Sequence, residues 1–154
     1  MTPVELHYKS KTWATWLALL GGSLGLHRFY LHGMADPWGW LSSLPTLLGV
    51  YGVHRARTLG LDDGLSWLLI PLLGLMLAGT MLRAIVYGLT SDEVWNARFN
   101  PLKRKHRSGW FTVIGVIFAL ALGAAALMAT IAFTAQRFFE YQIDQAARTP
   151  RLVN

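Results

Sequence analysis

The sequence of 154 residues contains no cysteine. Disulfides, thiolate nucleophiles, iron–sulfur clusters and thioether-linked haem are therefore excluded by chemistry. Charge is also scarce, because only 14% of the residues are Asp, Glu, Lys or Arg, against about 25% in soluble domains. Hydrophobic residues make up 53% of the chain, and the mean hydropathy is +0.36. This balance is typical of a chain whose solvent is lipid, so we expect an integral membrane protein.

Carboxylates are the scarcer of the two charge types, with 8 Asp and Glu against 14 Lys and Arg, a net charge of +6 and a pI near 10.1. None of these acids falls inside a hydrophobic segment, whereas ion-coupled transporters usually need such groups in the membrane interior. The sequence also lacks a nucleophile elbow, a glycine-rich phosphate loop with a lysine and a zinc-binding helix motif. We therefore predict no enzymatic activity, and we expect the basic charge to face anionic lipid rather than nucleic acid.

Hydrophobic segments approach or exceed the ~20 residues that cross a ~30 Å hydrocarbon core. They cover residues 12–30, 38–53, 65–89 and 109–135. The second segment is short and contains Pro45 and Gly49, which indicates a kinked or tilted helix. The predicted fold class is all-α, a polytopic transmembrane helical bundle with about four spans. The first span is expected to be retained rather than cleaved as a signal peptide, because no small-residue cleavage pattern follows it.

Polar stretches divide the chain into three predicted parts. These are a helical hairpin at 1–60, a second two-span hairpin at 61–135 with a basic interfacial loop at 90–108, and a polar helical tail at 136–154. Within the loop, TSDEVWNARFNP has capping-box spacing between Thr90 and Glu93 and predicts a short helix at the membrane surface before the last span. The tail is expected to extend the last helix by two or three turns until Pro150 ends it.

Basic residues set the expected orientation. The densest basic cluster consists of Lys103, Arg104, Lys105 and Arg107, so we expect this loop to be cytoplasmic and to contact anionic lipid headgroups. With four spans, both termini would then lie outside, and the loop at 27–36 would lie inside. The predicted location is the inner membrane of a cell.

Small residues four positions apart let helix backbones approach closely. The first hydrophobic segment has this spacing at Gly21 and Gly25, and the last has it at Gly115, Ala119 and Gly123. Such a stripe does not by itself choose between a neighbouring helix of the same chain and a second copy. We favour packing within the chain.

Histidine is the only plausible ligand type for a cofactor in this sequence. His27 and His32 are five positions apart and diverge by ~140° on a regular helix, and His54 is expected across the bilayer from His27. We therefore predict no metal, haem or other cofactor. Arg83 lies near the end of the third segment, where it is expected to snorkel to the interface; a functional arginine that lines a cavity is the alternative.

The stretch LALLGGSLGLHRFYLHG resembles the signature of the TM-two domain family, which consists of two-helix membrane modules. That signature is a glycine-rich first helix ending in Gly-x-(His or Asp)-Arg-Phe-Tyr-Leu-Gly. The matching positions are Gly25, His27, Arg28, Phe29, Tyr30, Leu31 and Gly33, with His32 inserted before the last glycine. The resemblance covers the first 60 residues or so and implies a membrane-integral hairpin with this loop on the cytoplasmic side. From the residues alone, Arg28 is expected to anchor the membrane exit at headgroup level.

These patterns favour an integral membrane accessory or scaffold protein, a subunit that acts by helix packing and by contact with other membrane proteins or with itself. The alternative is a small conduit or transporter component that uses Arg83 and helix breaks at Pro45 and Pro71. A third hypothesis is a cofactor-binding subunit that shares histidines between chains.

Overall fold

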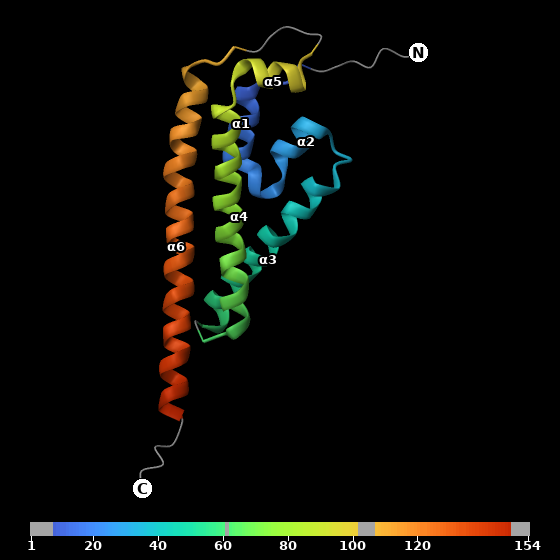
Figure 1. The fold of residues 1–154 in the computed structure, drawn as a ribbon. Coiled ribbons are helices and arrows are strands. Elements are labelled where there is room, and N and C mark those ends of the chain that lie inside the picture. Colours follow the sequence, from blue (N-terminus) through green and yellow to red (C-terminus); the bar gives the residue numbers. More distant parts are fainter. Residues whose placement is uncertain (1–7, 61, 102–106, 149–154) are drawn as a thin grey trace.

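The computed structural model describes residues 8–60, 62–101 and 107–148. Its elements are α1 (Lys11–Gly21), the 3₁₀ turn η1 (Gly22–Leu24), α2 (Leu26–His32), α3 (Pro37–Leu59), α4 (Gly64–Leu89), α5 (Asp92–Phe99) and α6 (Trp110–Arg148). Figure 1 shows α4 and α6 side by side, α1 against one end of this pair, and α3 crossing α4 at an angle. The all-helical class predicted from the sequence is confirmed for the described residues.

Two helices are long and apolar enough to span a membrane: α4 (Gly64–Leu89) and the part of α6 from Trp110–Ala147. Within the apolar window of each helix, only 22% of the residues are buried inside the chain. The core helices of a soluble protein are buried far more completely, so these helices indicate a membrane protein, as the composition does. Trp67 and Tyr87 of α4 are 20 positions apart, which corresponds to ~30 Å of helix, about the thickness of a hydrocarbon core.

Close packing between α4 and α6 occurs at contacts that recur every seven positions, each with a glycine on one of the two helices. The facing pairs are Gly74 with Thr130, Met81 with Gly123, and Gly88 with Val116. A β-carbon added to Gly123 would lie 2.7 Å from Cβ of Met81. A period of seven keeps each residue on one seam of an antiparallel helix pair, where a small residue opposite a larger one lets the backbones approach.

The helix α1 packs against both helices of this pair. Its buried residues Ala18 and Leu19 form one core with Met81 and Ala84 of α4 and with Ala119 of α6. Three helices therefore meet at this end of the molecule, and the small residues at 18, 84 and 119 are fully buried there.

The crossing of α3 and α4 is close because α3 presents glycine to it. A β-carbon on Gly49 would lie 2.6 Å from the backbone nitrogen of Leu73. Neither Pro45 nor Pro71 interrupts its helix, since α3 and α4 continue through both residues. The second hydrophobic segment is also longer than expected, because α3 has 23 residues.

The prediction of one helix over residues 12–30 is wrong. The helix α1 ends at Gly21, η1 turns the chain, and Gly25 adopts a φ of +80° before α2 starts. This left-handed conformation costs a glycine little, and the run GGSLG has low helix propensity. We call residues 11–32 the reversing hairpin, because α2 leads the chain back toward the end of the bundle where α1 begins (Figure 1).

Hydrogen bonds confirm that the two ends of the hairpin lie together. The backbone N–H of Ser10 donates to the hydroxyl of Tyr30 at 2.8 Å, and the ammonium of Lys9 donates to the carbonyl of Leu31. Residues 8–10 and the turn after α2 therefore lie at the same end of the bundle as α5, while α6 terminates at the opposite end (Figure 1). The expectation that the N-terminal segment and the loop at 27–36 lie on opposite sides is wrong for this reason.

Candidate functional site

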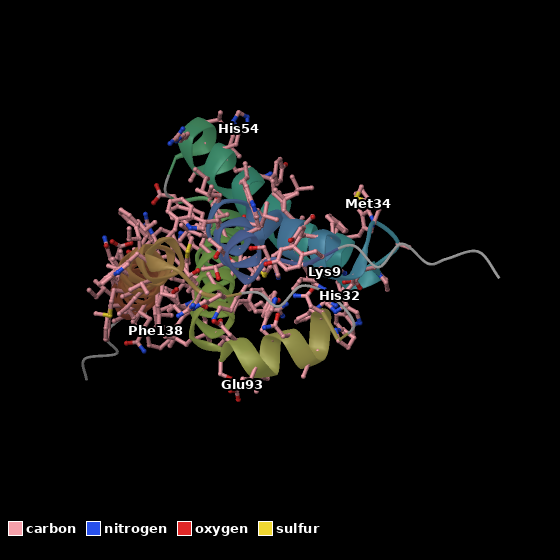
Figure 2. All side chains as sticks on the ribbon, turned by 90° about the horizontal axis from the view of Figure 1, so that it is seen from above. Lys9, His32, Met34, His54, Glu93 and Phe138 are labelled. Atoms are coloured by element: carbon pink, nitrogen blue, oxygen red, sulfur yellow. The ribbon has the colours of Figure 1, made fainter. Side chains whose placement is uncertain are left out.

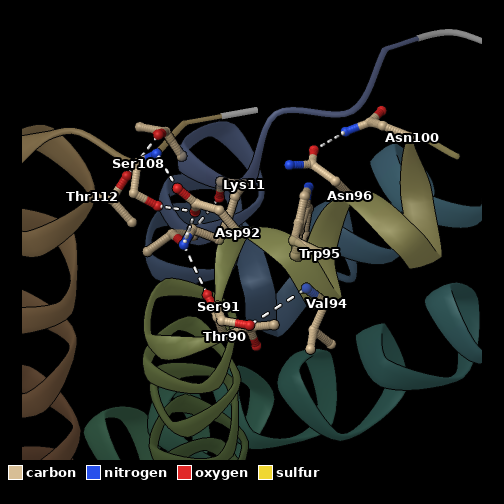
Figure 3. Close-up of polar contacts among 12 residues, drawn as sticks. Lys11, Thr90, Ser91, Asp92, Val94, Trp95, Asn96, Asn100, Ser108 and Thr112 are labelled. Atoms are coloured by element: carbon tan, nitrogen blue, oxygen red, sulfur yellow. Dashed lines mark hydrogen bonds and ion pairs between the residues drawn. The ribbon is translucent and has the colours of Figure 1, made fainter. Parts of the chain in front are cut away.

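The polar side chains at the α5 end include a buried ion pair. Lys11 is only 3% exposed, and its ammonium donates to Oδ1 of Asp92 at 2.7 Å and to the carbonyl of Thr90 at 2.8 Å (Figure 3). Asp92 also accepts hydrogen bonds from the backbone N–H of Ser108, at 2.7 Å, and from its hydroxyl. One carboxylate thus joins α1, α5 and the segment that leads into α6.

The environment of Asp92 favours its ionised form. Burial alone would raise the pKa of this carboxyl, but the hydrogen bonds from Lys11 and Ser108 outweigh burial and hold the pKa well below its usual range. The cap of α5 differs slightly from the prediction: Ser91, not Thr90, accepts from the N–H of Val94. The short helix itself is present over Asp92–Phe99.

A second set of contacts clamps Lys9 against α5. The indole N–H of Trp95 donates to the carbonyl of Lys9 at 2.9 Å, and the side-chain amide of Asn100 donates to the same oxygen at 3.0 Å. In return, the backbone N–H of Lys9 donates to Oδ1 of Asn100 at 2.9 Å. Because Lys9 also contacts α2, these bonds tie the reversing hairpin to α5.

The signature residues that resemble the TM-two family build the reversal itself. A β-carbon on Gly25 would lie 2.3 Å from the carbonyl oxygen of Gly39, so the start of α2 touches α3 backbone to backbone. Phe29 lies against Gly39 and packs on Trp40 at a ring distance of 5.1 Å. Gly33 ends α2 with a φ of +92°, and its N–H donates to the carbonyl of Phe29.

Two more signature residues face the inside of the hairpin. Leu31 is 3% exposed and packs with Ala14 of α1 and Trp95 of α5. Tyr30 receives the hydrogen bond from Ser10. Contacts within the fold therefore explain why Leu31 is apolar and why Tyr30 has a hydroxyl group.

Arg28 holds the turn between α2 and α3. Its Nε donates to Oδ2 of Asp36 at 2.7 Å, and Nδ1 of His32 lies 3.8 Å from the same oxygen. Asp36 also caps α3 by accepting from the N–H of Trp38 at 3.2 Å. The bond from Arg28 lowers the pKa of Asp36 from its usual value. Arg28 thus has a carboxylate partner within the chain. The sequence alone predicts only a contact with lipid headgroups.

His27 is buried rather than placed at the surface. It is 1% exposed, its ring lies 5.8 Å from that of Tyr87, and neither ring nitrogen has a hydrogen-bond partner among the described residues. No group of three or more His, Asp or Glu residues in the described part of the chain is placed to hold a metal ion. Figure 2 shows His32 and His54 far apart, so these two do not form a site within one chain.

A pocket of about 490 Å³ lies between α2, α4 and α5. Its charged lining consists of Arg28, Arg83 and Arg98, together with His32, and none of the lining residues is acidic. We call this site the arginine pocket. It brings together side chains from three helices, and Arg83, which is exposed, forms part of its lining.

Of the two predicted packing stripes, the one in α6 lies at contacts between helices, and the one at Gly21 and Gly25 does not. In α6, a β-carbon on Gly115 would lie 3.2 Å from Nε1 of Trp16, and Ala119 and Gly123 contact the core of the same chain. Gly21 lies at the end of α1 against Leu26, so Gly21 and Gly25 do not form a helix face. The sequence reasoning missed the heptad seam of α4 and the glycines of α3; the seven-residue period was the signal that could have found the seam.

The predicted lipid-contacting cluster is only partly described. Lys103, Arg104 and Lys105 lie outside the described residues, and Arg107 is exposed just before α6.

No protein-family model, curated protein or solved structure matches the chain. The resemblance to the TM-two family therefore depends on the signature residues, and the function is argued from the structure.

Proposed function

We propose that the protein is an integral membrane accessory or scaffold subunit that packs its helices against another membrane protein and catalyses no reaction. The observation that carries this proposal is that α3 is long enough to cross a membrane, has modest hydropathy and exposes apolar side chains on one face. This helix has 23 residues, ~35 Å at 1.5 Å per residue, yet it is not one of the two helices apolar enough to span a membrane alone. A crossing helix of modest hydropathy is better accommodated beside protein than in lipid.

The outer face of α3 also has the pattern of a helix-packing seam. Its exposed residues Leu41, Leu44, Leu48 and Tyr51 recur at spacings of three and four, and we call them the α3 stripe. Each is between 46% and 55% exposed. Apolar residues at this spacing fit the groove of a second helix. Because the stripe at Gly115, Ala119 and Gly123 is already covered by the same chain, the α3 stripe is the surface that we assign to a partner.

The proposal includes three crossings, by α3, α4 and α6, with the reversing hairpin entering and leaving on the α5 side. Basic residues then favour one orientation. The segments that meet at the α5 end contain Lys9, Lys11, Arg28, Arg98 and Arg107, and the sequence between α5 and α6 adds three more. The elements at the opposite end contain Arg55, Arg57, Arg137 and Arg148, and the sequence after α6 adds Arg151. The positive-inside rule therefore supports a cytoplasmic α5 end.

The conduit hypothesis has less support. It required helix breaks at Pro45 and Pro71, and both helices are continuous there. Mid-helix prolines are tolerated in membranes when neighbouring groups satisfy the freed carbonyls. Arg83 lines a pocket confined to α2, α4 and α5.

Site-specific crosslinking in native membranes tests the scaffold proposal. A photoreactive side chain replaces Leu48 in the α3 stripe, and the control replaces Leu120, which is 61% exposed on α6. We expect a discrete adduct of higher mass from position 48 and none from position 120. Co-expression of two differently tagged copies then shows whether the adduct is a second copy or another protein. An absence of any adduct at position 48, with the protein also monomeric in mild detergent, contradicts the proposal.

A further inference from the structure

We propose that the arginine pocket binds the phosphate of an anionic phospholipid, with the acyl chains lying along the exposed apolar side chains of α4. The inference goes beyond the scaffold role and shares with it only the membrane location. Its ligand chemistry is a phosphate ester, which a lipid headgroup and a soluble molecule both offer.

Two of the three arginines in the pocket have no acidic partner among the described residues. Arg83 and Arg98 take part in no ion pair among the described residues. None of the lining residues is acidic, and Asp36, the carboxylate partner of Arg28, is only 8% exposed. Guanidinium groups favour phosphate because their planar array of N–H donors matches its oxygens in pairs. Two arginines without a carboxylate partner in one pocket therefore indicate an anionic ligand.

Three aromatic side chains that contact one another line one side of the pocket. The ring of Trp95 lies 5.9 Å from that of Tyr87 and 4.5 Å from that of Phe99. Arg98 lies over the ring of Phe99 at 5.4 Å, which orients its guanidinium. The buried ring of His27, which has no hydrogen-bond partner among the described residues, lies 5.8 Å from the ring of Tyr87. The site thus combines the exposed guanidinium groups of Arg83 and Arg98 with buried and half-buried aromatic side chains from α4 and α5.

The depth of the pocket favours a lipid over a soluble phosphate ester. Tyr87 lies ~30 Å along α4 from Trp67, so the two aromatics mark the two interfaces, and Arg83 lies one turn inward from Tyr87. On the same part of α4, Leu82, Val86 and Leu89 are 60%, 54% and 70% exposed. An acyl chain can cover these side chains while its phosphate reaches the arginines.

Lipid binding to the full-length protein in neutral detergent tests the inference. Fluorescent short-chain phosphatidylglycerol is titrated into the wild type, Arg83→Met and Arg98→Met, and phosphatidylcholine is titrated in parallel. The matched control is Arg107→Met, which removes an exposed arginine from the same end of the bundle but outside the pocket. Unchanged helical circular dichroism in each variant shows that the fold is retained.

We expect the wild type to prefer phosphatidylglycerol, and each pocket variant to bind it about tenfold more weakly, because each loses charge-assisted hydrogen bonds to phosphate. Arg107→Met should change the affinity by less than about twofold, as an exposed charge screened by salt does. Equal binding of the two lipids, or equal losses in Arg83→Met and Arg107→Met, would overturn the inference. If soluble glycerol phosphate competes as well as the lipid, the lipid assignment is wrong. None of these outcomes depends on crosslinking at Leu48, so the scaffold proposal is tested separately.

Discussion

Gly25→Ala is expected to lower the free energy of unfolding by about 3 kcal/mol, because two separate costs add at this position. The φ of +80° disfavours any residue with a β-carbon. The added methyl would also lie 2.3 Å from the carbonyl oxygen of Gly39, so α2 and α3 would have to separate. Thermal or denaturant unfolding in detergent, followed by the helical circular dichroism signal, measures the loss.

Two other glycines separate these costs. Gly33 has a φ of +92° and a ψ of +168°, a region that essentially only glycine adopts, and nothing lies within 4 Å of its added β-carbon, so Gly33→Ala should cost about 2 kcal/mol from backbone strain alone. Gly79, within α4, has open space and no positive φ, so Gly79→Ala should be neutral or slightly stabilising. If Gly25→Ala costs only the roughly 1 kcal/mol expected from its left-handed φ, the close contact between α2 and α3 is not present.

Asp92→Asn is expected to have the second large effect, a loss of about 2 to 3 kcal/mol, because it leaves the buried ammonium of Lys11 without its carboxylate. Lys11→Met should cost less, since Asp92 is 31% exposed and keeps its bonds to Ser108. Combining the two substitutions should recover part of the loss, as expected for groups in direct contact. Asp62→Asn, on an exposed residue in the turn before α4, is the matched control and should be neutral.

The same pair makes stability depend on pH. Since the pKa of Asp92 is lower in the folded chain than its usual ~3.9, its stabilisation is fully present above about pH 4 and is lost as the pH falls through the lowered value. Unfolding of the wild type at a series of pH values should therefore show a decline below about pH 4. That decline should be shallower in Asp92→Asn, although Asp36 and Asp63, whose pKa values are also lowered, maintain part of it. An equal decline in both proteins would exclude Asp92 as a source.

Residues in regular apolar helices were predictable from the sequence. The third hydrophobic segment, expected at 65–89, is α4 at Gly64–Leu89, with Asp63 as its cap. The last segment and its extension before Pro150 correspond to α6, which reaches Arg148. A continuous apolar run with polar caps leaves a helix as the main way to satisfy the backbone in lipid, which is why these predictions succeed.

The reversing hairpin was not predictable in the same way. An apolar run of this length fits a helix that crosses the membrane, and it fits equally a segment that enters and returns to the same side. Hydropathy gives the number of apolar residues but not the direction of the chain. What decides the direction is the φ of Gly25 together with long-range bonds such as those from Lys9 to Leu31 and Asn100. These contacts join residues 22 and 91 positions apart, and no local pattern reveals them.

The arginine pocket was not predictable from the sequence for the same reason, because it too depends on contacts between distant residues. Arg28, Arg83 and Arg98 come from three different helices and share no motif. The sequence identified Arg83 as a residue that either snorkels or lines a cavity, but its neighbours could be named only once the hairpin returns α2 to the level of α5.

Cysteine accessibility tests the reversing hairpin, the central claim of this account, most directly, because the chain has no cysteine of its own. Single cysteines replace the exposed residues Tyr8, Met34 and Thr58, one variant at a time, and sealed vesicles are labelled with a membrane-impermeant maleimide. We predict that positions 8 and 34 are labelled from the same side and position 58 from the other. Labelling of positions 8 and 34 from opposite sides would mean that the first segment crosses the membrane, and would contradict the account.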